Sequence, residues 1–220
     1  MTSIISINQT SSYYPRRLLD LQDAPTEIFC LGNLRALELP SFAIVGSRKA
    51  TLQGIKHSHY FAKSIANMGA CIISGLAEGI DTAAHQGALA SRLNPSTIAV
   101  CGTSLDRCYP FKNKELFKLI ADKGLLISEY RPGTITKPYH FPQRNRLIAA
   151  LSSGTLVVEA SLRSGSLITA KIANELGRDV FAIPNAIGRV CSAGCHQLIR
   201  EGAKLTEKPS DIAEELLFRL

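Results

Sequence analysis

The sequence lacks any hydrophobic run long enough to cross a membrane. No apolar segment approaches the roughly 20 residues that a spanning helix needs, and residues 1–17 do not follow the charged-then-apolar order of a secretory signal. We therefore expect a soluble, cytoplasmic protein with no membrane partner. The six cysteines are scattered through 220 residues, a length that needs no covalent cross-links, so reduced thiols are expected rather than a disulfide framework.

The sequence also lacks the common fingerprints of nucleotide cofactors. No G-x-G-x-x-G motif follows the first strand-like run at 42–45, and no P-loop lysine signature is present. Cys191, Cys195 and His196 are closely spaced, but no second pair of ligands stands at the distance that a zinc site requires. We expect neither a cofactor nor a bound metal.

What the sequence does contain is a local excess of positive charge. The whole chain carries 25 Lys and Arg against 18 Asp and Glu, a formal net charge of +7. Between Arg131 and Lys171 six basic residues stand against one acidic residue, Glu159. This excess is compatible with a polyanionic partner, and its concentration in one segment suggests where such a partner would bind.

Short apolar runs alternate with segments of helical spacing from Phe42 onward. Each run is apolar throughout, which is typical of parallel strands covered by helices on both faces. The six expected strands are 42–45, 70–73, 97–101, 125–129, 154–158 and 180–183. The expected helices are 51–68, 80–90, 113–123, 146–152, 166–176, 193–201 and 210–218. The pattern predicts a single main α/β domain with a Rossmann-like, doubly wound, mostly parallel sheet.

The chain divides into three expected parts. Residues 1–40 are interpreted as a lead-in segment with one edge strand or short helix, residues 41–205 as the core, and residues 206–220 as a C-terminal helix. Within the core, 131–143 holds three prolines and a glycine without periodicity, so we expect a long surface loop there.

Small and basic residues directly follow several of the expected strands. Gly46, Ser47 and Arg48 follow the first, and Ser74 and Gly75 follow the second. Ligands of open α/β sheets bind beyond the carboxyl ends of the strands, so these turns should gather at one edge of the sheet. Ordinary tight turns with a solvated arginine would explain the same residues about equally well.

Two basic turns enclose the fifth expected strand. Arg144, Asn145 and Arg146 precede it, just after Phe141, and Arg163 opens a Ser-Gly-Ser turn at 164–166 that begins a helix. Guanidinium groups and free N–H groups at a helix start suit phosphate, while an aromatic ring suits stacking of nucleobases. The alternative is a pair of helix starts with solvated arginines.

Three acidic or histidine side chains are the candidates for catalysis. Asp81 is favoured as a helix cap, and His85 one turn later could pair with it, although no nucleophile completes such a pair. Glu159 ends a buried strand and is expected to pair with an arginine or a backbone N–H, because an isolated buried carboxylate is costly.

Five segments together resemble the DprA/Smf family of DNA-processing proteins. They read GSR at 46–48, SGLAEGID at 74–81, RNRLIAALS at 144–152, EASLRSGS at 159–166 and CHQLIREGA at 195–203, and the resemblance covers 14–220. It implies a non-enzymatic DNA recombination mediator with an extended Rossmann-like core, which binds single-stranded DNA without a cofactor and forms a homodimer. It also implies that the protein protects incoming DNA and loads the recombinase RecA during natural transformation of competent cells.

The resemblance also implies which residues bind the DNA. Carried over by motif position, they are Gly46, Ser47, Arg48, Ser74, Gly75, Phe141, Arg144, Asn145, Arg146, Arg163, Ser164, Gly165 and Ser166. Phe141 would stack on a base, with Arg163 opposite it as a phosphate clamp. Family members often carry an N-terminal helical domain and a C-terminal winged-helix-like domain, for which 220 residues leave no room.

An enzyme or sensor for a free nucleotide is the alternative function. A phosphoribohydrolase on a similar fold would use Glu159 or Asp81 in catalysis. It would also need a Pro-Gly-Gly-x-Gly-Thr phosphate turn, where this sequence has only Ser164, Gly165 and Ser166. The sequence therefore favours binding of a strand over hydrolysis of a nucleotide.

Overall fold

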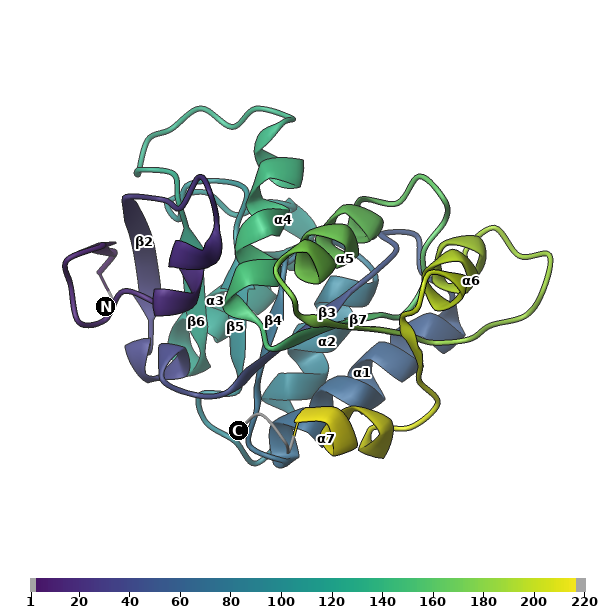
Figure 1. The fold of residues 1–220 in the computed structure, drawn as a ribbon. Coiled ribbons are helices and arrows are strands. Elements are labelled where there is room, and N and C mark those ends of the chain that lie inside the picture. Colours follow the sequence, from purple (N-terminus) through teal and green to yellow (C-terminus); the bar gives the residue numbers. More distant parts are fainter. Residues whose placement is uncertain (1–2, 217–220) are drawn as a thin grey trace.

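Nine strands form one sheet in the computed structural model, which describes residues 3–216 (Figure 1). The strands are β1 (Ile5–Asn8), β2 (Glu27–Gly32), β3 (Ser41–Val45), β4 (Cys71–Ser74), β5 (Thr97–Val100), β6 (Leu125–Ser128), β7 (Gly154–Val157), β8 (Asp179–Ala182) and β9 (Lys204–Leu205). Their order across the sheet is β1-β2-β6-β5-β4-β3-β7-β8-β9. Neighbours from β6 to β9 in this order run parallel, whereas β1 and β2 pair antiparallel with each other and β2 pairs antiparallel with β6.

Helices cover both faces of this sheet. The α-helices are α1 (Leu52–Asn67), α2 (Ile80–Leu89), α3 (Lys114–Lys123), α4 (His140–Leu151), α5 (Gly165–Glu175), α6 (Ala193–Arg200) and α7 (Ser210–Leu216), and the short 3-10 helices are η1 (Arg16–Asp20), η2 (Leu34–Leu37) and η3 (Phe111–Asn113). Adjacent residues of β4 show the two layers. Ile72 packs in a cluster with Phe61 of α1, while Ile73 packs in the opposite cluster with Leu147 of α4. Burial on both faces explains why the strands are apolar throughout.

The predicted fold class is confirmed, and the six expected strands appear as β3 to β8 with ends within one residue of the prediction. The segment 1–40 does more than expected, because it adds two strands, β1 and β2, to the β6 edge. In β1 only Ile7 is buried. A strand with one buried residue leaves no apolar run in the sequence, so it could not be recognised.

The largest correction concerns α4. The sequence predicted a loop at 131–143 and a helix from 146, but the helix begins at His140 and therefore contains Phe141 and Arg144. Pro142 reads as a loop residue, yet proline is tolerated in the first turn of a helix, where its missing N–H has no helical partner to lose. The expected basic turn is thus a rigid helical surface.

The C-terminal part contains α7, and residues 217–220 of the expected 206–220 helix lie outside the described residues. Across the described residues 3–216, we find no helix with the length and apolar content needed to cross a bilayer.

Candidate nucleic-acid interface

A cleft of about 710 Å³ opens beyond the carboxyl ends of β3 and β7. It lies where the chain switches direction across the sheet, because β4, β5 and β6 continue to one side of β3 and β7 lies on the other. This switch point is the usual ligand position in an open α/β sheet. The side chains and turns that line the cleft include Arg48, Lys49, Arg144, Asn145, Ser164, Gly165, Ser166 and Arg189.

The turn after β3 is tightly packed at Gly46 and Ser47. A Cβ atom on Gly46 would lie 2.7 Å from Cγ1 of Ile80, so only glycine fits there. The N–H of Ser47 donates to the carbonyl oxygen of Glu159 at 2.8 Å, and its own carbonyl accepts from the N–H of Ile80 at 3.2 Å. Gly46 and Ser47 therefore build the turn, while Arg48 and Lys49 face the cleft.

An aromatic pair borders a second hollow of about 210 Å³ that shares Arg48, Lys49 and Arg144 with the cleft. The guanidinium carbon of Arg48 lies 5.9 Å from the ring centroid of Phe141. The ring of Tyr109 lies 4.9 Å from that of Phe141, tilted by 44°. We call the cleft and this hollow together the groove, because Arg48, Lys49 and Arg144 line both.

Gly102 explains how the ring of Phe141 reaches this position. A Cβ atom at Gly102 would come within 2.8 Å of Cδ1 of Phe141, so the ring lies directly against the backbone that follows β5. Phe141 is only partly buried and leaves part of its surface open. A ring supported on one side and open on another is suited to stacking with a planar ligand.

Arg144 forms the floor of the groove and does not project from it. Its side chain is only 4% exposed, and Nη1 donates to the carbonyl oxygens of Gly75 and Val100. Nε donates to Oδ1 of Asn145 at 3.2 Å, and Nδ2 of Asn145 donates to the carbonyl oxygen of Gly165 at 3.2 Å. These bonds connect β4, β5, α4 and α5 beneath the cleft.

The structure does not bring Arg146 to the groove. Its guanidinium pairs with Glu129 at 2.7 Å and with Asp23 at 2.8 Å, and only 11% of its side chain is exposed. Arg144 and Arg146 are two positions apart on α4, which separates them by about 200° around the helix axis. They therefore face opposite sides, a result that the expected turn conformation did not predict.

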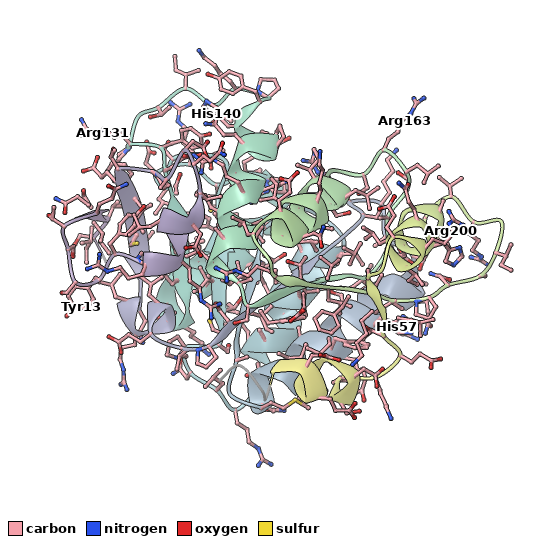
Figure 2. All side chains as sticks on the ribbon, viewed as in Figure 1. Tyr13, His57, Arg131, His140, Arg163 and Arg200 are labelled. Atoms are coloured by element: carbon pink, nitrogen blue, oxygen red, sulfur yellow. The ribbon has the colours of Figure 1, made fainter. Side chains whose placement is uncertain are left out.

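The start of α5 faces the cleft, but Arg163 does not. Oγ of Ser164 caps the helix by accepting from the N–H of Ser166 at 3.4 Å, and the first N–H groups of α5 lie at the cleft wall. Such N–H groups and the helix dipole favour an anion. Arg163 is exposed and extends outward, away from the body of the protein (Figure 2).

Three basic or aromatic residues that line the groove were not identified from the sequence: Lys49, Tyr109 and Arg189. Lys49 follows Arg48, and Tyr109 lies in the connection after β5, so their place after a strand was a usable signal. Arg189 lies in the connection after β8, so it carried the same signal. Among residues 3–216, Arg48, Lys49 and Arg189 form no ion pair with an acidic side chain.

Ser74 and the carboxylate of Asp81 have structural partners. Ser74 is fully buried and donates to the carbonyl oxygen of Ile44 at 2.7 Å. Asp81 does not cap α2, whose N-cap is Gly79. Oδ2 of Asp81 instead accepts from the N–H groups of Gly75 at 3.2 Å and Ala77 at 3.3 Å, which secures the turn after β4. Burial raises the pKa of Asp81, and the nearby Arg144 opposes this shift.

His85 and Glu159 are likewise held in the fold. Nδ1 of His85 lies 2.7 Å from Oγ1 of Thr97, so His85 does not bond to Asp81 as a catalytic pair would require. Glu159 accepts from the N–H of Thr51 at 2.9 Å and from its hydroxyl at 2.5 Å, which confirms that a backbone N–H compensates its burial.

The cysteines and histidine near the C-terminus do not gather into a metal site. Cys195 is buried with Sγ 3.6 Å from the carbonyl oxygen of Val157, and Nε2 of His196 lies 2.9 Å from that of Asn185. In the part of the chain that the structure describes, no three His, Cys, Asp or Glu side chains are placed to hold a metal ion.

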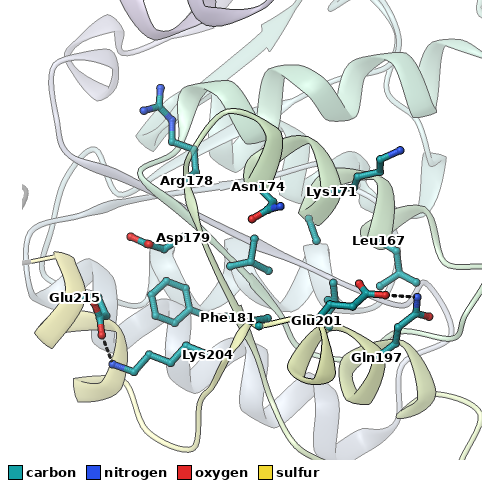
Figure 3. Close-up of a pocket in the computed structure, with 15 residues that line it drawn as sticks. Leu167, Lys171, Asn174, Arg178, Asp179, Phe181, Gln197, Glu201, Lys204 and Glu215 are labelled. Carbon is teal, nitrogen blue, oxygen red and sulfur yellow. Dashed lines mark hydrogen bonds and ion pairs between the residues drawn. The ribbon is translucent and has the colours of Figure 1, made fainter.

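A further cavity of about 570 Å³ lies between α5, β8, β9 and α6 (Figure 3). Its rim carries charges that already have partners, because Nζ of Lys204 lies 2.7 Å from Oε1 of Glu215 (Figure 3). Gln197 donates to Glu201 at 2.7 Å on the same rim. This cavity is therefore a weaker candidate than the groove for binding a polyanion.

A family model matches almost the whole chain. The family model for DNA recombination-mediator protein A matches residues 5–217. This chain belongs to that family. Among curated relatives, the DNA processing protein DprA of Streptococcus pneumoniae is 49% identical over 205 residues, which cover 93% of this chain and 72% of the relative. Protein Smf of Escherichia coli is 44% identical over 96% of this chain, which spans only 56% of that protein.

Solved structures of the recombination-mediator family match the whole fold. DprA from S. pneumoniae superposes with a TM-score of 0.92 at 47% identity, covering 97% of this chain and 74% of that one. DprA from Helicobacter pylori superposes with a TM-score of 0.89 at 30% identity, covering 99% of this chain and 97% of that one. That structure was described for its single-stranded DNA binding mode. A molybdenum cofactor binding protein from Rippkaea orientalis shares the fold alone. It is 17% identical, with a TM-score of 0.54, and the match covers 80% of this chain and 94% of that one.

Proposed function

We propose that this recombination-mediator chain binds single-stranded DNA in the groove. One observation carries the proposal: Arg48 and Lys49 have no acidic partner among residues 3–216 and lie beside the partly open ring of Phe141. Unpaired cations next to a supported aromatic ring are what a flexible polyanion with exposed bases requires. A duplex would hide its bases, so the ring favours a single strand.

Each part of the groove would meet a different part of the nucleotide. Arg48, Lys49 and Arg189 would neutralise phosphates, and the N–H groups at the start of α5 would donate hydrogen bonds to a further phosphate oxygen. The ring of Phe141 would stack on a base. Because stacking and phosphate contact do not read base edges, the strand would be bound with little preference for sequence.

The wider role of the family supports a larger proposal for this chain. We infer that it protects incoming single-stranded DNA in the cytoplasm, loads the recombinase RecA during natural transformation, and acts as a homodimer. Family membership and the 49% identity to DprA of S. pneumoniae support this role. The position of the groove at the surface leaves a bound strand accessible to a second protein.

The geometry supports binding over catalysis. Both carboxylates that a phosphoribohydrolase-like enzyme would use are engaged, Glu159 with Thr51 and Asp81 with the turn after β4. A general base must have a lone pair within reach of the proton that it removes. Glu159 does not line the groove, and Asp81, which lines the cleft, uses Oδ2 to accept from two backbone N–H groups.

A titration with fluorescent oligo(dT), run beside a nucleotide-hydrolysis assay, tests this function. We expect an anisotropy increase that weakens steeply with salt, and no hydrolysis of free nucleotides. The Arg48→Ala variant should lose affinity, while Arg35→Ala, an exposed arginine in η2, should not. Wild-type hydrolysis without DNA binding would favour the nucleotide enzyme instead.

A further inference from the structure

Exposed aromatic and basic side chains continue beyond the groove along the segment that follows β5. Tyr109, which contacts Phe141, is 53% exposed, and Phe111 two residues later is 74% exposed. Nζ of Lys114 lies 5.3 Å from the ring centroid of Phe111. Phe111 is thus a large apolar ring facing solvent, with a cation on it, immediately outside the groove.

This segment is held firmly in place. Asn113, which is buried, donates through Nδ2 to the carbonyl oxygen of Leu76 at 2.9 Å and to Oγ1 of Thr82 at 2.9 Å. Leu76 belongs to the turn after β4 and Thr82 to α2, so η3 is tied to the same turn that Asp81 secures. The position of Phe111 relative to the groove is therefore set by the fold and not by a mobile loop.

Basic side chains lie along the same path, next to the acidic residues Asp106 and Glu115. Lys112 pairs with Glu78 at 3.2 Å and neutralises the acidic residue at the rim of the groove. Lys114 and Arg107 form no ion pair within the described range 3–216. An anionic strand that leaves the groove past Tyr109 would meet the cations Arg107 and Lys114, while Glu78 and Glu115 are already paired with Lys112 and Lys118.

We propose that Tyr109, Phe111, Lys112 and Lys114 form an exit surface on which the DNA strand continues after the groove. This proposal rests on the proposed function of the groove. Phe111 stacks on a base, Lys114 contacts the adjacent phosphate, and Tyr109 bridges from Phe141 to Phe111. Single-stranded nucleic acid is the occupant because an exposed ring with an amine beside it suits a base and its neighbouring phosphate.

Two oligo(dT) probes, of about 6 and about 20 nucleotides, separate the groove from the exit surface, since only the longer strand can occupy both. We expect Phe111→Ala and Lys114→Ala to leave the affinity for the short probe unchanged. Each should lower the affinity for the long probe about fivefold to tenfold, as expected for one lost stack or phosphate contact. A loss of affinity for both probes, or for neither, would overturn the proposed exit surface.

Control variants keep the two proposals distinct. Tyr13→Ala removes a ring as exposed as Tyr109, at 53%, from another part of the surface, and should change neither affinity (Figure 2). Arg48→Ala should weaken both probes. If Arg48→Ala binds normally, the groove assignment is wrong. If Arg48→Ala weakens binding but Phe111→Ala does not, only the exit surface is wrong.

Photo-crosslinking gives a direct measurement of contact. A long probe carrying 5-iodouracil should crosslink to Phe111, identified by fragmentation of the tryptic peptide 108–112. Tyr109 of the same peptide and Phe141 of another line the groove, so the crosslinked residue, and not the peptide, reports on the exit surface. A crosslink at Tyr109 or Phe141 without one at Phe111 would contradict the proposal.

Discussion

The guanidinium of Arg144 lies directly against the backbone of Gly75. Nη1 donates to the carbonyl oxygen of Gly75 at 2.5 Å, and a Cβ atom on that glycine would approach Nη1 to 2.5 Å. The arginine is held there by a second bond to the carbonyl oxygen of Val100. An arginine at a site rich in positive charge thus acts first as a support for the turn after β4.

Gly75→Ala should destabilise the fold, because the added methyl group meets a buried guanidinium that cannot move without losing its bonds. We expect a loss of about 1–3 kcal/mol in the free energy of unfolding, measured by urea denaturation. Gly165→Ala is the matched control, since its Cβ atom would meet only Asn145 Nδ2, at 3.9 Å. Equal stability of the two variants would show that the Arg144 side chain moves away from the added methyl group at little energetic cost.

Arg48→Ala should weaken single-stranded DNA binding more than Arg163→Ala, although both should weaken it. Arg48 lines the groove, whereas Arg163 extends into solvent (Figure 2). Removing one phosphate contact should reduce the slope of log K against log salt concentration by about 0.7 for a single strand. The measurement is anisotropy with oligo(dT) over a range of salt concentrations. A larger loss for Arg163→Ala would mean that its loop closes over the bound strand.

Arg146→Ala should lower stability and leave the groove intact. The pair with Glu129 is largely buried, with 11% and 10% of the two side chains exposed, so the variant leaves a buried carboxylate without its partner. We expect a loss of about 2–4 kcal/mol by urea denaturation. Lys118→Ala, which removes an exposed pair with Glu115, should cost under about 1 kcal/mol. Reduced DNA affinity of folded Arg146→Ala would contradict the assignment.

The buried His85 should make the protein less stable in mild acid. Thr97 donates its hydroxyl hydrogen to Ile72, so Oγ1 of Thr97 accepts from Nδ1–H of His85. Burial lowers the pKa of His85 to about 3, from an ordinary value of 6.5.

The sign of the effect follows from the lowered pKa. The stabilisation is fully present above about pH 6.5 and is lost as the pH falls toward 3, by up to about 1.4 kcal/mol per pH unit, because only the unfolded chain takes up the proton. Urea midpoints measured between pH 7 and pH 5 test this. His85→Gln should flatten the dependence in that range. If the urea midpoint of His85→Gln depends on pH as steeply as that of the wild type, other titrating groups cause the dependence.

The start of α4 shows why part of the site could not be predicted. Prolines at 138 and 142 and the aromatic residues between them carry no helical period, so a loop was the better local interpretation. The helix forms because Leu147 and Ile148 are buried in the core against the sheet, which extends a helix backward through Phe141. Tertiary packing here outweighs local propensity.

The sequence by itself determined the six core strands, the class of sheet, and the edge where Arg48, Phe141 and the start of α5 meet. Those features follow from local patterns, because runs buried on both faces must be apolar and loops after parallel strands share an edge. Only the tertiary structure decided that Arg144 faces the groove floor, that Arg146 turns to Glu129, and that Tyr109 completes the aromatic pair. The direction of a side chain depends on helix phase and on partners distant in sequence, which no local pattern records.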